Sequence, residues 1–163
     1  AVGEVCLRSE AVMEGYYGDR AATEAVFTDD RAIRTGDLGY LDHQGRLHLV
    51  GRTKEMFVRG GYNVFPLEVE EALADHPGVA HVAVAPSPDP VMGEIGVAIV
   101  VPRSEENPVT LTSLREHAAG RLAAYKLPEA LLITTELPRT AMEKIDRRQL
   151  AAMADDAIRE PRR

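Results

Sequence analysis

The sequence predicts an α+β fold: a small domain with the element order ββαββαβα, preceded by a short and mostly β segment. One observation behind this prediction is that β-branched apolar runs alternate with runs of helical periodicity from residue 55 onward. Another is a change of character after Val50, where the sequence Gly-Arg-Thr-Lys-Glu is polar and lacks core periodicity. We therefore place a boundary between two segments at 51–55.

The first segment predicts a strand, a short helix and a hairpin. Val5–Leu7 is typical of a strand, and Asp19–Val26 has room for one or two helical turns. Tyr40–Leu41 and Leu47–Val50 flank the sequence Asp-His-Gln-Gly, whose composition is typical of a turn. These two runs therefore predict a β-hairpin.

The second segment opens with two short strands and a helix. Met56–Val58 and Tyr62–Phe65 are apolar runs separated by Arg-Gly-Gly, which predicts a strand pair. Pro66 suits the first position of a helix, because the N–H that it lacks would have no partner there. Apolar residues then recur on one helical face as far as His76, where a Pro-Gly pair ends the helix.

The rest of the chain predicts three strands and two helices. The strands are rich in valine, isoleucine and alanine, and residues that can cap a helix precede both helical runs. The predicted elements are strands at Val79–Ala85, Ile95–Val101 and Ala130–Thr134, and helices from Thr112 or Ser113 to Leu122 and from Asp146 to Ala154.

The composition excludes several classes of function. Hydrophobic residues make up 45% and charged residues 28%, which predicts a packed, soluble fold. The net charge of −7 argues against a nucleic-acid partner, since such binding depends on cations that contact phosphates. No apolar run approaches the roughly 20 residues of a membrane span. The lone Cys6, expected to be a small buried residue, fits a cytoplasmic location. The five histidines show no metal-ligand spacing, so we predict no metal site.

Three motifs, in this order and spacing, carry a family resemblance. They are Thr-Gly-Asp-Leu-Gly at 35–39, Gly-Arg-Thr-Lys-Glu at 51–55 running into Arg-Gly-Gly-Tyr-Asn-Val-Phe-Pro at 59–66, and Leu-Pro-Arg-Thr at 137–140 leading to Lys144. Together they resemble the adenylate-forming superfamily of acyl-CoA synthetases, luciferases and peptide-synthetase adenylation domains. The likeness extends from Gly3 to about Leu150.

The resemblance implies a domain organisation and a set of ligands. Residues 1–54 would be the end of a large N-terminal domain, and 55–163 the whole of a small, mobile C-terminal domain. The phosphate-binding loop and the acid pocket of the family have no counterpart here, so we expect a fragment that can self-associate through exposed surface. The parent enzyme would use ATP, Mg²⁺ and CoA with a carboxylic acid.

Lys144 is the candidate catalytic residue. When a carboxylate attacks the α-phosphate of ATP, negative charge gathers in the transition state, and a positioned cation stabilises it. In the family a lysine on a late loop has this role, and Lys144 holds its position. Many relatives have glycine just before this lysine, whereas this chain has Met142-Glu143, which we expect to confine the backbone to ordinary φ values. The structural alternative is a solvated lysine near a helix start.

Four residues resemble the family's ribose site and hinge. Asp37 corresponds to a carboxylate that holds the ATP ribose, and Arg52 to a partner that contacts the ribose or the α-phosphate. Alternatively, Asp37 only forms a turn and Arg52 is a surface residue. Lys54 and Glu55 fall where the family has its hinge, which needs residues that absorb large φ/ψ changes.

Three further residues resemble the CoA site. Gly60 and Gly61 would let the pantetheine arm of CoA pass close to the backbone, and they also suit a turn between strands. Lys126 is a candidate partner for a CoA phosphate, with a solvated lysine as the alternative.

The predicted function is that of an acid:CoA ligase, with a fatty or related acid favoured by the Arg-Gly-Gly-Tyr-Asn-Val-Phe-Pro motif. The alternatives are an adenylation domain of the peptide-synthetase or luciferase type, and a folded module without activity of its own. The residues that would select the acid lie outside this chain.

Overall fold

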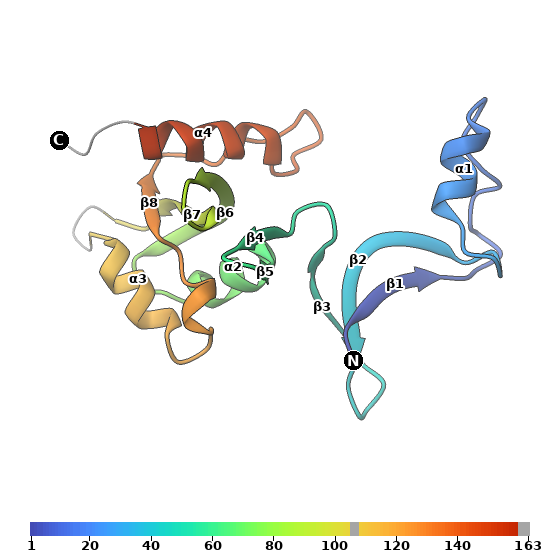
Figure 1. The fold of residues 1–163 in the computed structure, drawn as a ribbon, viewed down its shortest axis with the longest axis horizontal. Coiled ribbons are helices and arrows are strands. Elements are labelled where there is room, and N and C mark those ends of the chain that lie inside the picture. The colour runs from blue at the N-terminus through green and yellow to red at the C-terminus, as the bar shows by residue number, and fades with distance from the viewer. Residues whose placement is uncertain (105–107, 160–163) are drawn as a thin grey trace. The chain divides into compact units, whose positions relative to one another are not determined.

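The computed structural model describes residues 1–104 and 108–159 (Figure 1). The chain divides into two compact units, Ala1–Glu55 and Met56–Arg163. No helix in the described part of the chain is long and apolar enough to cross a membrane. Each unit has its own sheet.

The first unit is a three-stranded antiparallel sheet with one short helix. Its strands, in the order β1-β2-β3, are β1 (Gly3–Leu7), β2 (Ile33–Leu41) and β3 (Leu47–Arg52), and its helix is α1 (Arg20–Val26). Asp19 caps α1 by accepting a hydrogen bond from the N–H of Ala22. The predicted hairpin is confirmed, but β2 begins well before Tyr40, so the Thr-Gly-Asp-Leu-Gly motif lies inside a strand.

The second unit contains a five-stranded sheet. Its strands are β4 (Phe57–Arg59), β5 (Tyr62–Val64), β6 (Val79–Asp89), β7 (Gly93–Pro102) and β8 (Ala130–Ile133). The order is β5-β4-β7-β6, and β8 runs parallel to β7. The helices are α2 (Pro66–Ala74), α3 (Leu111–Ala118), the 3₁₀ turn η1 (Ala124–Lys126) and α4 (Arg147–Arg159). The predicted order ββαββαβα is confirmed.

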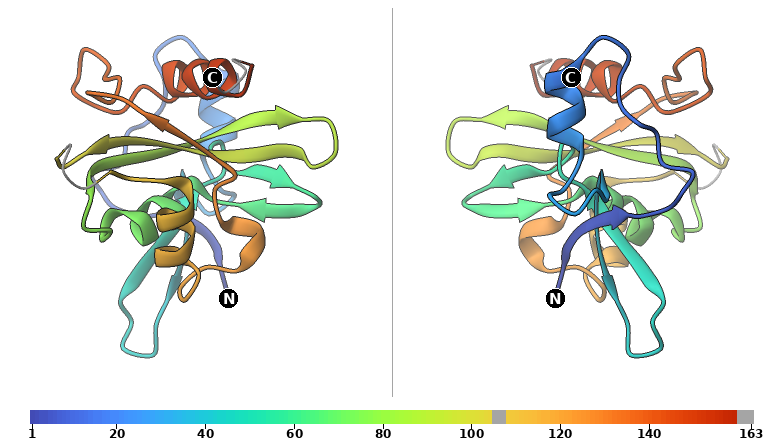
Figure 2. Two further views of the ribbon diagram at one scale, coloured as in Figure 1. Left: turned by 90° about the vertical axis from the view of Figure 1, so that its left-hand side faces the viewer. Right: turned by 90° about the vertical axis from the view of Figure 1, so that its right-hand side faces the viewer.

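Alternate residues of β6 and β7 face two separate cores. Val84, Ala98 and Val100 belong to the core shared with α2 and α3, whereas Ala83 and Ile99 belong to the one shared with α4. Helices consequently cover both faces of this sheet (Figure 2). A strand buried on both faces is apolar along its whole length, which explains the uninterrupted valine, isoleucine and alanine run of β7.

The free edge of β6 is blocked by side chains and prolines. The N–H of Val84 donates to Glu70 Oε1 at 2.8 Å, and Glu70 is paired with Arg147 from α4. Pro86 and Pro88, two and four residues further, carry no N–H to offer another strand. Because a proline on a free edge breaks no hydrogen bond to another strand, β6 can continue through Pro86 and Pro88, past the predicted end at Ala85.

Several predicted boundaries were wrong for local reasons. The helix expected at Thr112 or Ser113 is capped by Thr110, which exchanges capping bonds with Ser113, and it ends at Ala118 rather than Leu122. The last helix runs on to Arg159, beyond the predicted end. Cys6 is exposed, not buried, because β1 has no residue buried on either face.

Candidate functional site

Asp37 and Arg52 meet in the first unit. They are directly paired across β2 and β3, and Arg52 Nε donates to Asp37 Oδ1 at 2.7 Å. Gly36 has a φ of 74°, and its carbonyl accepts a hydrogen bond from Thr53 at 2.9 Å. The side chain of Asp37 is 28% exposed, so its carboxylate is partly sheltered yet reachable from solvent. A carboxylate of this kind can accept hydrogen bonds from vicinal hydroxyls.

An open hollow of about 770 Å³ lies beside this pair, within the first unit. Arg52 lines it together with Thr35 and Gly36, and so do the two predicted hinge residues. Lys54 and Glu55 belong to the turn that follows β3, in which the N–H of Glu55 donates to the carbonyl of Arg52 at 3.1 Å. The boundary between the compact units falls directly after this turn.

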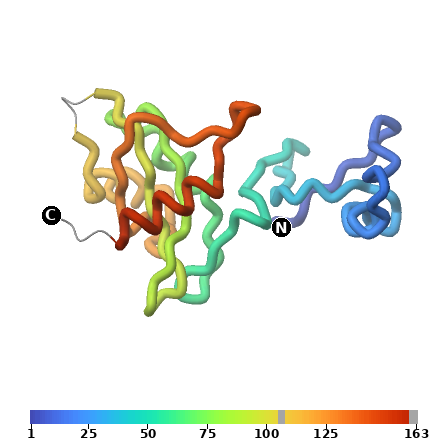
Figure 3. Tube along the Cα trace, turned by 90° about the horizontal axis from the view of Figure 1, so that it is seen from above, coloured from blue at the N-terminus to red at the C-terminus, as the bar shows by residue number. Residues whose placement is uncertain are grey.

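Lys144 lies in an exposed loop between β8 and α4, whose path can be followed in Figure 3. Backbone hydrogen bonds close the loop: Thr140 N–H to the carbonyl of Lys144 at 2.7 Å, and Asp146 N–H to the carbonyl of Pro138 at 2.9 Å. Asp146 also caps α4 through its side chain, by accepting from the N–H groups of Arg148 and Gln149. The base of the loop is therefore fixed while the lysine side chain faces solvent.

Glu143 has a left-handed backbone, with φ 59°. The expectation that it confines the chain to ordinary φ values was wrong, because the surrounding hydrogen bonds impose the conformation. Its N–H donates to the carbonyl of Thr140 at 3.0 Å, and its own carbonyl accepts from Arg139 Nη1 at 2.8 Å. Arg139 is part of the Leu-Pro-Arg-Thr motif, but the sequence did not show that its guanidinium would hold the residue before Lys144.

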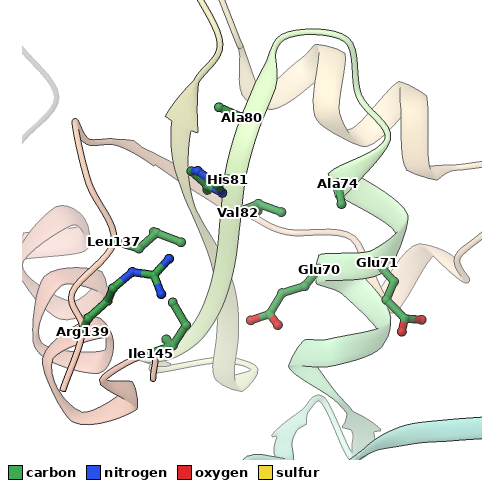
Figure 4. A pocket seen from close by; sticks show the side chains of 9 residues that line it. All are labelled: Glu70, Glu71, Ala74, Ala80, His81, Val82, Leu137, Arg139 and Ile145. Carbon is green, nitrogen blue, oxygen red and sulfur yellow. The ribbon is translucent and has the colours of Figure 1, made fainter. Parts of the chain in front are cut away.

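A hollow of about 340 Å³ adjoins the base of this loop. Leu137, Arg139 and Ile145 line one side, and residues of α2 and β6 the other (Figure 4). His81, an exposed residue of β6, also lines it. The hollow is shallow and open, so it offers no enclosed space for a substrate.

Gly60 and Gly61 form the turn between β4 and β5, with φ values of 54° and 86°. A side chain at either position would be strained, which explains the two glycines structurally. The N–H of Gly60 also donates to the carbonyl of Met92, in the turn between β6 and β7, at 2.8 Å. The turn therefore presents bare, anchored backbone at the surface.

Lys126 is held by an acidic partner. Its Nζ lies 2.6 Å from both carboxylate oxygens of Glu68, and its side chain is only 18% exposed. A CoA phosphate would have to compete with this carboxylate. The solvated lysine considered from the sequence does not match this geometry.

Comparison with known proteins shows which family this chain resembles. The family described as AMP-binding enzyme C-terminal domain matches residues 68–144, which end on the candidate lysine. Sulfoacetate–CoA ligase of Cupriavidus necator is 43% identical over 91% of this chain. The chain belongs to the adenylate-forming, AMP-binding enzymes. Indoleacetate–CoA ligase of Aromatoleum aromaticum is similarly 42% identical over 93% of the chain.

Solved structures of adenylate-forming enzymes show the same fold. The o-succinylbenzoate CoA synthetase of Bacillus subtilis, in complex with its acyl-adenylate intermediate, matches all of this chain with a TM-score of 0.83 and 34% identity. The amide bond synthetase McbA of Marinactinospora thermotolerans matches 94% with a TM-score of 0.87 and 34% identity. The chain spans 31% of each of these structures, and 29% and 30% of the two ligases above.

Proposed function

We propose that this chain forms the C-terminal part of an ATP-dependent acid:CoA ligase. In the first half-reaction, a carboxylate oxygen attacks the α-phosphorus of ATP, giving an acyl-adenylate and releasing pyrophosphate. In the second, the sulfur of CoA attacks the acyl carbon, the bond to AMP breaks, and the thiol proton passes to solvent. Residues 1–54 belong in this proposal to the end of the large domain, and 55–163 to the small mobile domain.

The observation that carries the proposal is the presentation of Lys144. Its loop is closed by backbone hydrogen bonds at both ends, while its ammonium group faces solvent. A cation fixed in this way can enter a neighbouring site and stabilise charge there without costly reorganisation. The similarity to ligases that act with CoA supports the same role for this lysine.

The ATP ribose is assigned to Asp37 and Arg52. The 2′- and 3′-hydroxyls would donate to the Asp37 carboxylate, while the guanidinium of Arg52 holds that carboxylate and stays within reach of a phosphate oxygen. No three His, Cys, Asp or Glu side chains converge in the described part of the chain. We therefore assign the Mg²⁺ that accompanies ATP to residues of the parent enzyme outside this chain.

The hinge is assigned to Lys54 and Glu55. The division of the chain into units directly after Glu55 supports this position. Rotation at 54–55 would bring either Lys144 or the Gly60-Gly61 turn to the large domain.

Replacing Lys144 by alanine in the full-length enzyme tests the function. Acid-dependent exchange between ATP and pyrophosphate should fall by at least ~10²-fold, because the cation acts in the adenylation transition state. Thioester formation from a preformed acyl-adenylate should be spared. Arg148→Ala, which removes an exposed cation from the nearby helix, is the matched control and should leave both half-reactions intact. Equal loss of both half-reactions in Lys144→Ala would indicate a structural lysine and contradict the proposal.

The identity of the acid and of its acceptor lies beyond this chain. Relatives are named for sulfoacetate, indoleacetate and long-chain fatty acids. Segments similar to this chain therefore occur in enzymes that are named for very different acids. The likeness to the amide bond synthetase McbA supports a second candidate, in which an amine takes the place of CoA. Incubating the adenylated enzyme with CoA or with amines, and identifying the product by mass, separates the two. The 163-residue chain alone should show no exchange activity.

A further inference from the structure

The turn between β4 and β5 is tied to a distant part of the chain by an ion pair. Arg59 Nη2 lies 2.5 Å from Glu129 Oε1, although the two residues are 70 positions apart in sequence. Arg59 is the last residue of β4, and Glu129 directly precedes β8. Both side chains are largely buried, with exposed fractions of 19% and 24%. The pair therefore connects the Gly60-Gly61 turn to the start of β8.

A ring contact makes a second connection between the same two segments. Tyr62, the first residue of β5, stacks on Tyr125 of η1 with 4.6 Å between ring centroids and 23° between ring planes. Tyr62 is 57% exposed, so this contact lies at the surface, whereas the ion pair lies deeper. Together the two contacts hold the hairpin at both of its strands.

The first residues of β7 support the hairpin from another direction. The N–H of Val58 donates to Glu94 Oε2 at 2.9 Å, and Arg59 is directly paired with Gly93. The hydrogen bond to Glu129 raises the pKa of the Arg59 guanidinium, burial opposes this rise, and the charges of Glu129 and Asp89 add to it.

The hairpin needs these contacts, because its own backbone pairing is short. β4 and β5 have three residues each, and Arg59 with Gly93 is the single register pair between β4 and β7. A two-stranded ribbon of this length does not hold its position alone. Side-chain contacts therefore act together with the backbone hydrogen bond from Gly60 to Met92 in fixing where the two glycines lie.

We propose that the Arg59–Glu129 pair positions the Gly60-Gly61 turn for the thioester-forming half-reaction. The proposal rests on the function proposed above, in which this turn approaches the pantetheine arm of CoA. Arg59 Nε and Glu129 Oε2 are buried without a hydrogen-bond partner among the described residues. Such a pair adds little net stability, because desolvation offsets its attraction. What it supplies is a fixed position for the turn.

The test uses the full-length enzyme with Arg59→Ala, Glu129→Ala, the double variant and Glu129→Gln. The thioester-forming rate is measured in single turnovers from preformed acyl-adenylate at saturating CoA, and adenylation by pyrophosphate exchange. Both single variants should lose about 10²-fold in the thioester step, the scale expected for a misplacement of about 1 Å. Adenylation should stay within about twofold, since Lys144 lies on another loop. Glu129→Gln keeps an acceptor oxygen and should restore part of the rate.

Two comparisons separate positioning from general destabilisation. Arg103→Ala removes a partly buried hydrogen bond to the carbonyl of Val79, at the opposite end of the β6–β7 pairing from Gly93, and should lower stability without changing the ratio of the two half-reactions. The double variant should be no slower than the slower single variant, because both substitutions remove one interaction. Equal losses in both half-reactions, additive losses in the double variant, or an unchanged thioester rate would each overturn the proposal. Failure of the proposed function is distinguishable: the unaltered enzyme would then form no acyl-adenylate or no thioester.

Discussion

Replacing Glu143 by glycine is expected to stabilise the fold. Glu143 holds a φ of 59°, which costs a residue with a Cβ roughly 1–2 kcal/mol relative to the right-handed region. Glycine avoids that cost, but it loses about 0.5–1 kcal/mol through its greater freedom in the unfolded chain. The hydrogen bonds at this position use only the backbone N–H and carbonyl of Glu143, so glycine keeps them. Subtracting the low end from the low end and the high end from the high end gives a gain of about 0.5–1 kcal/mol.

Thermal and urea unfolding of the 163-residue chain measure this gain. For a chain of this length, about 0.5–1 kcal/mol corresponds to a rise in Tm of roughly 1–4 °C. Glu143→Ala keeps the Cβ and removes the charge, so it should gain nothing from relief of strain. Met142→Gly is the matched control, because Met142 is also exposed in the same loop but does not have a positive φ, and glycine there should destabilise the chain. If both glycine variants lost stability alike, the strain attributed to Glu143 would be refuted.

Two further predictions concern pH and nucleotide binding. Burial, and secondly the charge of His117, lower the pKa of His76 in the folded chain. In the unfolded chain His76 has its ordinary pKa of about 6.5, so between that pH and the lower folded-state pKa the unfolded chain binds more protons than the folded one. Stability should therefore fall as the pH drops from about 6.5 toward the folded-state pKa, and His76→Asn should weaken this dependence in matched urea titrations. Asp37→Ala in the full-length enzyme should raise the KM for ATP by about 10–100-fold, the loss expected for hydrogen bonds to a charged group. An unchanged KM for ATP would remove Asp37 from the ribose site, and a pH dependence identical in both proteins would remove His76 as its source.

The order of the elements could be predicted because it depends on local patterns. Helical periodicity after Pro66 and the β-branched run around Ile95–Val101 are visible in any short window of the sequence. Boundaries were less predictable where the place of a strand in the sheet decides them. Pro86 and Pro88 indicate the end of a strand, yet they lie within β6 because its edge faces no other strand.

The individual candidate residues could be predicted from the sequence, but the contacts that hold their side chains in place could not. Asp37, Arg52 and Lys144 stand in motifs that are recognisable from spacing alone, and their roles remain predictions. Spacing could not show that Asp37 and Arg52 would be directly paired, because register depends on how the strands align.

The sequence by itself determined the element order, the family and the candidate residues, because these depend on periodicity and on motifs that are continuous in the chain. The tertiary structure decided which side chains hold those candidates in place. Arg59 meets Glu129 across 70 residues, and Arg139 fixes the left-handed backbone before Lys144. The physical reason is that the Arg59–Glu129 contact forms only when packing brings separate segments together, whereas the Arg139–Glu143 contact, although local, depends on a left-handed backbone. Neither condition is encoded by periodicity or by a motif.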